Sequence, residues 1–135
     1  MASIRKEVRL ESSAQQVWAA LRDVGALHTR LVPGFVTDCQ MDGNARIVTF
    51  ANGVVARELI VDINDADRRV VWSSVGGRLT HHNASAQVFA DGDNHSRLVW
   101  VADLLPHELA DTIGTMMDHG LAAMKRAFAS TASAG

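Results

Sequence analysis

Hydrophobic and polar residues alternate at the start of the chain and then change to helical spacing. Over residues 3–11, isoleucine, valine and leucine are separated by charged residues, which predicts a strand with one side facing water. Two serines that can cap a helix follow, and apolar residues then recur at spacings of three and four until Gly25. A second short helix is predicted over residues 26–32, because the next residue is Pro33.

The middle of the chain has the pattern of an antiparallel meander. Short β-prone runs are separated by turn sequences such as DGN, NG, GG and DGDNH. The six runs are FVTDCQM, ARIVTFA, VVARELIVDI, RRVVWSSV, LTHHNASAQVF and SRLVWVADLL. Because tight turns join them, consecutive runs are expected to pair as neighbours in one sheet.

A long amphipathic helix is predicted after the last run, over residues 107–128. Its apolar stripe has members three and four positions apart, namely Leu109, Ile113, Met116, Met117, Gly120, Leu121, Met124 and Phe128. One face of this helix must therefore be buried. The order of elements predicts an α+β fold in which a curved, seven-stranded antiparallel sheet wraps around the C-terminal helix, with two short helices between strands one and two.

Composition limits the classes of function. The chain has 135 residues, 47% of them hydrophobic and 21% charged, with a formal net charge of −2. This length fits one domain, predicted over residues 1–129 and followed by a flexible tail over residues 130–135. The charge balance indicates no nucleic-acid partner, and no run is long enough for membrane insertion. Cys39 is the only cysteine, which excludes an internal disulfide and favours a cytoplasmic location.

The adjacent histidines His81 and His82 raise the question of a metal site. Neighbouring strand residues point to opposite faces, so the two rings cannot easily bind one ion, and no third ligand has a recognisable spacing. No metal site is predicted. A G-x-S-x-G nucleophile motif is also absent from the sequence.

Three strings and the terminal helix resemble the START-like superfamily, also called Bet v 1-like or SRPBCC, which has the helix-grip fold. The strings are VWAALRDVGALHTRLVPG, NGVVARELIVDINDADRRVVWSSVGG and RLTHHNASAQVFADGDNHSRLVWVADLLP. The chain is most similar to the bacterial polyketide cyclase/dehydrase and lipid-transport group, over nearly its whole length. This resemblance implies a cavity between the concave face of the sheet and the long helix, which holds hydrophobic or amphipathic small molecules.

The string INDADRRVVWSSVGG is also similar to plant abscisic acid receptors of the same superfamily. Those receptors have a mobile gate loop between strands three and four, whereas TFANGVV leaves only a tight turn here. The resemblance therefore does not extend to a hormone-sensing gate.

The predicted sixth strand has one polar face, made of His81, Asn83, Ser85 and Gln87. In an ordinary antiparallel sheet such a face points to water. The positions of Asn83 and Ser85 match pocket-facing positions of the receptors, so the resemblance favours an inward polar face.

Strands five and seven add candidates through the same resemblance. Trp72 corresponds to an aromatic pocket wall, with Ser74 on the same face, and Asp103 stands where related proteins place an acidic pocket residue. A desolvated carboxylate has a raised pKa, which suits proton transfer or ligand anchoring. The alternatives are a core tryptophan and a surface aspartate.

The predicted fourth strand leaves two assignments open. Alternation places Arg57 on the more apolar face and exposes Glu58. The resemblance favours an inward glutamate instead, and a β-bulge would reverse the phase. Both residues are candidates for the cavity, with a solvated charge pair as the alternative.

The helices supply the remaining candidates. His28 and Arg30 of the short second helix lie near the cavity mouth in the helix-grip fold, although exposed helix residues are the commoner explanation. The terminal helix would line the cavity through residues of adaptable or small size, namely Ile113, Met116, Met117 and Gly120.

Three functional hypotheses follow. In the first, the cavity binds a hydrophobic or aromatic small molecule without a cofactor, and polar residues led by His81, Asn83 and Asp103 fix its polar groups. In the second, the cavity is that of a polyketide cyclase or dehydratase, in which His81 or Asp103 moves a proton. In the third, the chain is a co-chaperone-like interaction domain, which a small or filled cavity with an exposed apolar patch would favour. The sequence leaves a homodimer open.

Overall fold

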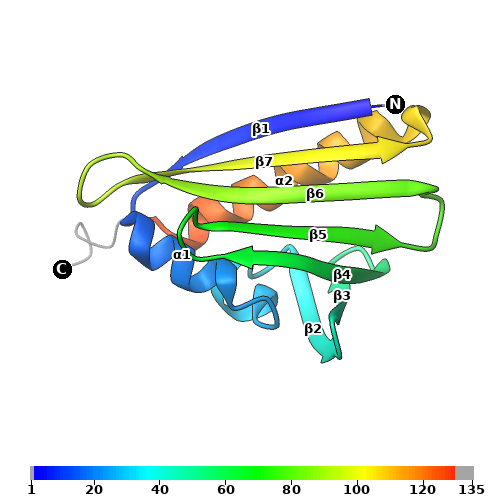
Figure 1. Cartoon of the computed structure of the whole chain (residues 1–135), viewed down its shortest axis with the longest axis horizontal. Helices are drawn as coiled ribbons and strands as arrows, with labels where there is room; N and C mark the ends of the chain where they lie inside the picture. Colours follow the sequence, from blue (N-terminus) through cyan, green and yellow to red (C-terminus); the bar gives the residue numbers. More distant parts are fainter. Residues whose placement is uncertain (1, 130–135) are drawn as a thin grey trace.

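The computed structural model describes residues 2–129 and has the predicted α+β architecture. The elements in chain order are β1 (Ala2–Leu10), α1 (Ala14–Arg22), the π-helix η1 (Leu27–Leu31), β2 (Val36–Asp42), β3 (Ala45–Phe50), β4 (Val55–Asn64), β5 (Arg69–Val75), β6 (His81–Ala90), β7 (Ser96–Leu105), the 3-10 helix η2 (His107–Leu109) and α2 (Ala110–Ala127). The strands form one antiparallel sheet in the order β1-β7-β6-β5-β4-β3-β2, and α2 lies behind it in Figure 1. The predicted helix-grip fold is confirmed, and the tail predicted over residues 130–135 lies outside the described residues.

Helix α1 is fixed at both of its ends. At its start, the Ser13 hydroxyl accepts the Gln16 amide hydrogen at 3.1 Å and the Gln16 side chain accepts the Ser13 amide hydrogen at 3.2 Å, which completes a capping box. Further along, Trp18 and Arg22 donate to the Asp65 carboxylate at 3.0 and 2.8 Å. The hydrogen bond from Arg22, followed by that from Trp18, lowers the pKa of Asp65. The helix is thereby attached to the β4–β5 turn.

A β-bulge in β4 changes which residues face the helix. The pairing of β4 with β5 shifts between Ile60 and Asp62. Before the shift, Ile60 pairs with the inward Trp72, and after it Ile63 pairs with Val70, which is fully buried. The two isoleucines therefore point to the same face although they are three residues apart, and of the two Ile60 packs against the core whereas Ile63 is 37% exposed. A single alternating phase over the whole strand, which would bury Arg57, is not what the chain adopts.

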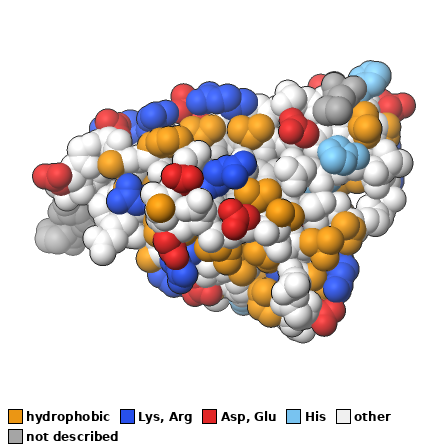
Figure 2. Space-filling model, in the orientation of Figure 1, with side chains coloured by type: hydrophobic (Ala, Val, Ile, Leu, Met, Phe, Trp, Pro, Cys, Tyr) orange, Lys and Arg blue, Asp and Glu red, His pale blue; other side chains and the backbone are white. Residues whose placement is uncertain are grey.

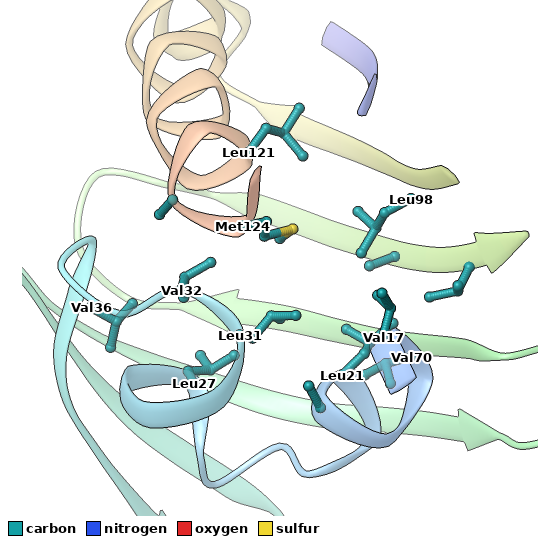
Figure 3. Close-up of a cluster of buried hydrophobic side chains, with 14 of the residues drawn as sticks. Val17, Leu21, Leu27, Leu31, Val32, Val36, Val70, Leu98, Leu121 and Met124 are labelled. Atoms are coloured by element: carbon teal, nitrogen blue, oxygen red, sulfur yellow. The ribbon is translucent and has the colours of Figure 1, made fainter. Parts of the chain in front are cut away.

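The hydrophobic core fills one end of the space between the sheet and α2. Figure 3 shows Leu121 and Met124 of α2 directed toward Leu31 and Val32 around η1, with Leu98 of β7 on the sheet side. All five side chains are buried. The core therefore closes this end, and the cavity described below begins where it stops.

The outer face of the sheet mixes charged and hydrophobic side chains, as Figure 2 shows from the same direction as Figure 1. Its exposed hydrophobic residues include Leu59 and Val61 of β4. Ion pairs such as Arg97 with Glu7 at 2.7 Å lie among the charged residues. Within residues 2–129, no helix has the length and apolar character needed to cross a bilayer.

Candidate functional site

A cavity of about 480 Å³ lies between the concave face of the sheet, η1 and α2. Most of its wall is apolar, and the polar side chains that reach it from the strands are Arg46, Glu58, Ser74 and His82. Its mouth is surrounded by the β3–β4 turn, the β5–β6 loop and the first turns of α2. The arrangement gives an apolar chamber with one polar region.

Small side chains on β6 create room for the cavity. Ala84 and Ala86 face inward and are buried, and Ala86 lines the cavity directly. The pairing of β6 with β7 sets Ala86 opposite Trp100 and His82 opposite Leu104. The inner face of this strand is therefore the one with small residues, because larger ones would occupy the space under α2.

Two tryptophans form an aromatic wall of the cavity. The ring centroids of Trp72 and Trp100 are 6.1 Å apart, at an interplanar angle of 50°. Helix α2 passes over Trp100 at Gly120, where an added Cβ would lie 2.8 Å from Cζ3 of the indole. We predicted that Gly120 lines the cavity, and it does not. Its lack of a side chain instead lets the Trp100 ring fit beneath the helix.

A buried ion pair lies in the cavity wall. Arg46 Nε donates to Glu58 Oε1 at 2.8 Å, and the side chains are 4% and 10% exposed. The Arg46 Nη1 group also donates to the Val24 carbonyl at 3.2 Å, and its guanidinium carbon lies 5.3 Å from the centroid of the Trp72 ring. The two charges neutralise each other, and the cation has further partners on two sides.

The His82 side chain joins β5 to β6 on the loop side of the last regular residue pair. Regular pairing of these strands ends at Trp72 and Ala84. Beyond that point the Ser74 amide donates to His82 Nδ1 at 3.0 Å, and the Ser73 hydroxyl donates to the His82 carbonyl. An amide N–H can only donate, so Nδ1 must carry a lone pair and the proton of the neutral ring lies on Nε2. Burial, and then the nearby His81, lower the pKa of His82, which favours this neutral form.

The predicted inward orientation of the polar face of β6 is wrong. His81 and Asn83 are exposed, Ser85 and Gln87 are half-buried, and none of the four lines the cavity. The Gln87 amide donates to the Asp67 carbonyl at 3.0 Å, outside the cavity. The ordinary rule that polar residues of a two-faced strand point to water is the one that applies here.

Asp103 also faces outward, so the predicted acidic cavity residue is misplaced. It pairs with Asn83 across the β6–β7 ladder and is half-buried. Together with His81, Asn83 and Thr80 it lines a second depression on the outer face. Ser74 and His82 contribute to both hollows, and they form the partition between them.

Three further candidates lie away from the cavity. Arg57 is on the outer face and pairs with Asp42 at 2.7 Å, whereas its neighbour Glu58 points inward. Arg30 is exposed and pairs with Asp23 at 3.0 Å. His28 is half-buried on η1 but does not line the cavity.

The remaining candidates do reach the cavity, but most of the wall was missed, including two of the four polar residues that the strands contribute. Trp72, Ser74, Glu58, Ile113, Met116 and Met117 line it. Arg46 and His82 were not among the candidates. A two-residue turn at Asn52–Gly53 would set Arg46 opposite Leu59, so the turn signal alone misses the pair. In the structure the loop has three residues, the Phe50 amide donates to the Val54 carbonyl, and Arg46 lies opposite Glu58. For His82 the signal was the small size of the other residues on its face.

Comparisons with known proteins agree with this architecture. The family model described as "Polyketide cyclase / dehydrase and lipid transport" matches residues 1–131. An uncharacterised protein from Bacillus thuringiensis is similar with a TM-score of 0.85 and 19% identity, over 96% of this chain and 100% of that one. A START superfamily protein from Mycobacterium smegmatis has a TM-score of 0.77 at 14% identity, over 93% and 96% of the two chains.

A third solved structure is the di-domain ARO/CYC protein BexL from the BE-7585A biosynthetic pathway. It aligns with a TM-score of 0.79 and 16% identity over 93% of this chain and 46% of BexL. At these identities the likeness concerns the fold. No curated protein matches the chain.

Proposed function

Because this chain belongs to the polyketide cyclase/dehydrase and lipid-transport family, we propose that it binds a hydrophobic or aromatic small molecule in the cavity between the sheet and α2. The observation that carries the proposal is the cavity itself. Its volume of about 480 Å³ lies in the range of about 300–1,000 Å³ typical of small-molecule sites. Its mostly apolar wall with one polar region is also the usual composition of such a site.

The shape of the wall favours a ligand with a flat or flexible apolar body. Trp72 and Trp100 offer aromatic surface on one side, and Met116 and Met117 of α2 offer adaptable side chains on the other. A hollow of this size in an otherwise packed domain leaves its lining residues without contacts. A bound apolar molecule would supply those contacts.

The two other hypotheses have less support. The enzymatic one assigned proton transfer to His81 and Asp103, and both face the outside of the sheet. The co-chaperone one is favoured by a small or filled cavity, whereas a cavity of about 480 Å³ is present. Ligand binding is the function that uses the residues which the fold brings together.

Native mass spectrometry of the protein as purified tests the proposal first, by looking for a small molecule that leaves on unfolding. A titration with N-phenyl-1-naphthylamine, an uncharged aromatic dye that fluoresces in apolar surroundings, tests it directly. We expect saturable binding to wild type and, for Ala86→Phe, affinity at least about 10-fold lower, because the new ring occupies the cavity.

Ser85→Phe is the matched control, since it adds the same ring one residue away on the outer face of β6. It should bind the dye as wild type does. The proposal fails if wild type binds neither the dye nor a co-purified molecule, or if the two phenylalanine variants bind equally well.

A further inference from the structure

The cavity wall contains two donors that have no partner among residues 2–129, the indole Nε1–H of Trp100 and the ring N–H of His82, and only the second lies in the polar region. His82 accepts the Ser74 amide hydrogen through Nδ1 at 3.0 Å, so its proton lies on Nε2. Nε2 has no hydrogen-bond partner among residues 2–129. His82 lines the cavity, also borders the outer depression, and is 8% exposed as a whole residue. A nearly buried donor without a partner is a position at which a ligand acceptor can gain a hydrogen bond.

Hydrogen bonds from β5 fix the position and the tautomer of the His82 ring. The Ser74 amide belongs to the backbone of β5 and cannot rotate. The Ser73 hydroxyl, also on β5, donates a hydrogen bond to the His82 carbonyl. The imidazole therefore cannot flip to offer Nδ1 without losing the Ser74 hydrogen bond. A histidine held in one tautomer is a donor at a fixed place, and it does not accept through the same nitrogen.

The charged residues of the cavity wall do not favour an anionic ligand. The inner charges are Arg46 and Glu58, and they form a pair with an Nε–Oε1 distance of 2.8 Å. Arg46 is further occupied by the Val24 carbonyl and the face of Trp72. A carboxylate brought into the cavity would lose its hydration and face Glu58, and no buried cation among residues 2–129 of the wall is free to pair with it. Arg78 lines the mouth, but it is exposed, and ions in solution screen its charge.

We propose that the cavity selects an uncharged ligand with an acceptor oxygen, such as an aromatic ketone, and that Nε2–H of His82 donates the hydrogen bond that orients this oxygen. The inference rests on the proposed binding function and names the ligand class and the residue that selects it. His82 is a binding residue in this account, and no bond is made or broken.

Three naphthalene probes test separately whether the ligand needs an acceptor oxygen and whether it must be uncharged. Prodan is an uncharged naphthyl ketone whose emission moves to longer wavelength when its carbonyl accepts a hydrogen bond. 2-(Dimethylamino)naphthalene has the same ring system without the carbonyl, and 6-(dimethylamino)-2-naphthoic acid replaces the ketone by a carboxylate. At pH 8 and moderate salt we expect wild type to bind Prodan most tightly of the three probes. Its affinity for the carboxylate should be at most about one tenth of its affinity for Prodan.

His82→Phe keeps the ring and removes the donor. Its affinity for Prodan should fall about 10-fold, the size of one net hydrogen bond, and the emission of bound Prodan should move to shorter wavelength. Affinity for 2-(dimethylamino)naphthalene should not fall. His82→Gln should restore part of the effect, since its amide oxygen can accept from Ser74 while its NH₂ group donates. His81→Phe is the matched control on the outer face and should leave all three affinities unchanged.

A measurement on the unmodified protein tests the proposal even if the variants do not fold. The ¹⁵N chemical shifts of the His82 ring should show an unprotonated Nδ1 and a protonated Nε2, with a change at Nε2 when Prodan is added. The opposite tautomer, or tighter binding of the carboxylate than of the ketone, would overturn the proposal. Equal loss of Prodan and carbonyl-free probe in His82→Phe would overturn it too. Failure of wild type to bind any uncharged probe, N-phenyl-1-naphthylamine included, would instead count against the binding function itself.

Discussion

His81 and His82 are adjacent in the sequence, but one faces the outside of β6 and the other faces the cavity. His81 is exposed and borders the outer depression with Asn83 and Asp103. His82 is buried, has its Nδ1 fixed by the Ser74 amide, and has its pKa lowered by burial. The same side chain is thus a solvated surface group at one position and a neutral, oriented donor at the next. The alternation of the strand makes the difference.

The same contrast recurs one hairpin away, between Arg57 and Glu58 of β4. Arg57 pairs with Asp42 on the outer face, where the side chains are 43% and 66% exposed. Glu58 pairs with Arg46 in the cavity wall, where the side chains are 4% and 10% exposed. The bond distances are nearly equal, at 2.7 and 2.8 Å. Burial, rather than bond geometry, is therefore what separates the two pairs in their contribution to stability.

The largest expected effect comes from breaking the inner pair. Glu58→Ala leaves the Arg46 guanidinium buried without its counter-charge, and we expect a loss of about 3–5 kcal/mol in the free energy of unfolding. Asp42→Ala breaks the outer pair, and the expected loss is about 0–1 kcal/mol because water solvates the Arg57 that remains. Urea denaturation followed by circular dichroism measures both.

The double variant Arg46→Met/Glu58→Leu sharpens the same comparison. Replacing both charges by apolar groups removes the desolvation cost together with the attraction, so most of the stability lost in Glu58→Ala should return. Losses of similar size in Glu58→Ala and Asp42→Ala would show that the inner pair is hydrated, contrary to its burial in the structure.

A second, smaller difference is expected along α2, between two glycines. At Gly120 an added Cβ would meet the Trp100 ring at 2.8 Å, so Gly120→Ala forces the indole or the helix to move, at a cost of about 1–3 kcal/mol. At Gly114 the nearest atoms are Lys6 Cε at 3.8 Å and Ile4 Cδ1 at 3.9 Å, which are ordinary contacts. Gly114→Ala should therefore stabilise the helix by about 0.5–1 kcal/mol.

Thermal unfolding of the two alanine variants gives the sign of each change. The near-ultraviolet circular dichroism of the tryptophans should change for Gly120→Ala and stay as in wild type for Gly114→Ala. A stabilised Gly120→Ala variant would mean that the cavity wall has room for Trp100 to shift, and Gly120 would then not be needed for its position.

Most of the fold could be predicted from the sequence because its signals are local. Alternation, turn residues and the capping serine define the elements, and short connections leave few ways to pair consecutive strands. The helix after Gly25 was also located, although it is a π-helix over Leu27–Leu31. The features that could not be read directly are those where one strand changes phase, as β4 does at its bulge near Val61.

The site was harder to predict because a cavity is defined by missing volume. The resemblance predicts that the polar face of β6 is the inner one, whereas Ala84 and Ala86 mark the inner face by their small size. Both faces of β7 are largely apolar, so that strand could not settle the choice. The pairing of Arg46 with Glu58 depends on a three-residue β3–β4 loop, one residue longer than the tight turn that the Asn–Gly sequence predicts, so the polar region could not be identified from the turn either.

The smallest expected effect is the pH dependence of stability that separates the two histidines. The pKa of His82 is lowered in the folded protein, first by burial and then by the charge of His81. The unfolded chain therefore binds a proton more readily than the folded one, and the stability contributed by neutral His82 is present above the ordinary histidine pKa of 6.5 and is lost as the pH falls below it. Arg46 and Glu58, in the same cavity wall, are present in every variant of this comparison.

Urea midpoints measured at several pH values between 5 and 8 test this sign. Wild type should lose stability toward pH 5 more steeply than His82→Gln, which has no group that titrates at this position. His81→Gln should follow the wild-type slope closely, because the ring it removes is exposed and contributes only the smaller of the two causes. If removing His81 flattened the profile more than removing His82, the neutral, oriented imidazole would have to be assigned to the outer face. The donor proposed for the cavity would then be lost with it.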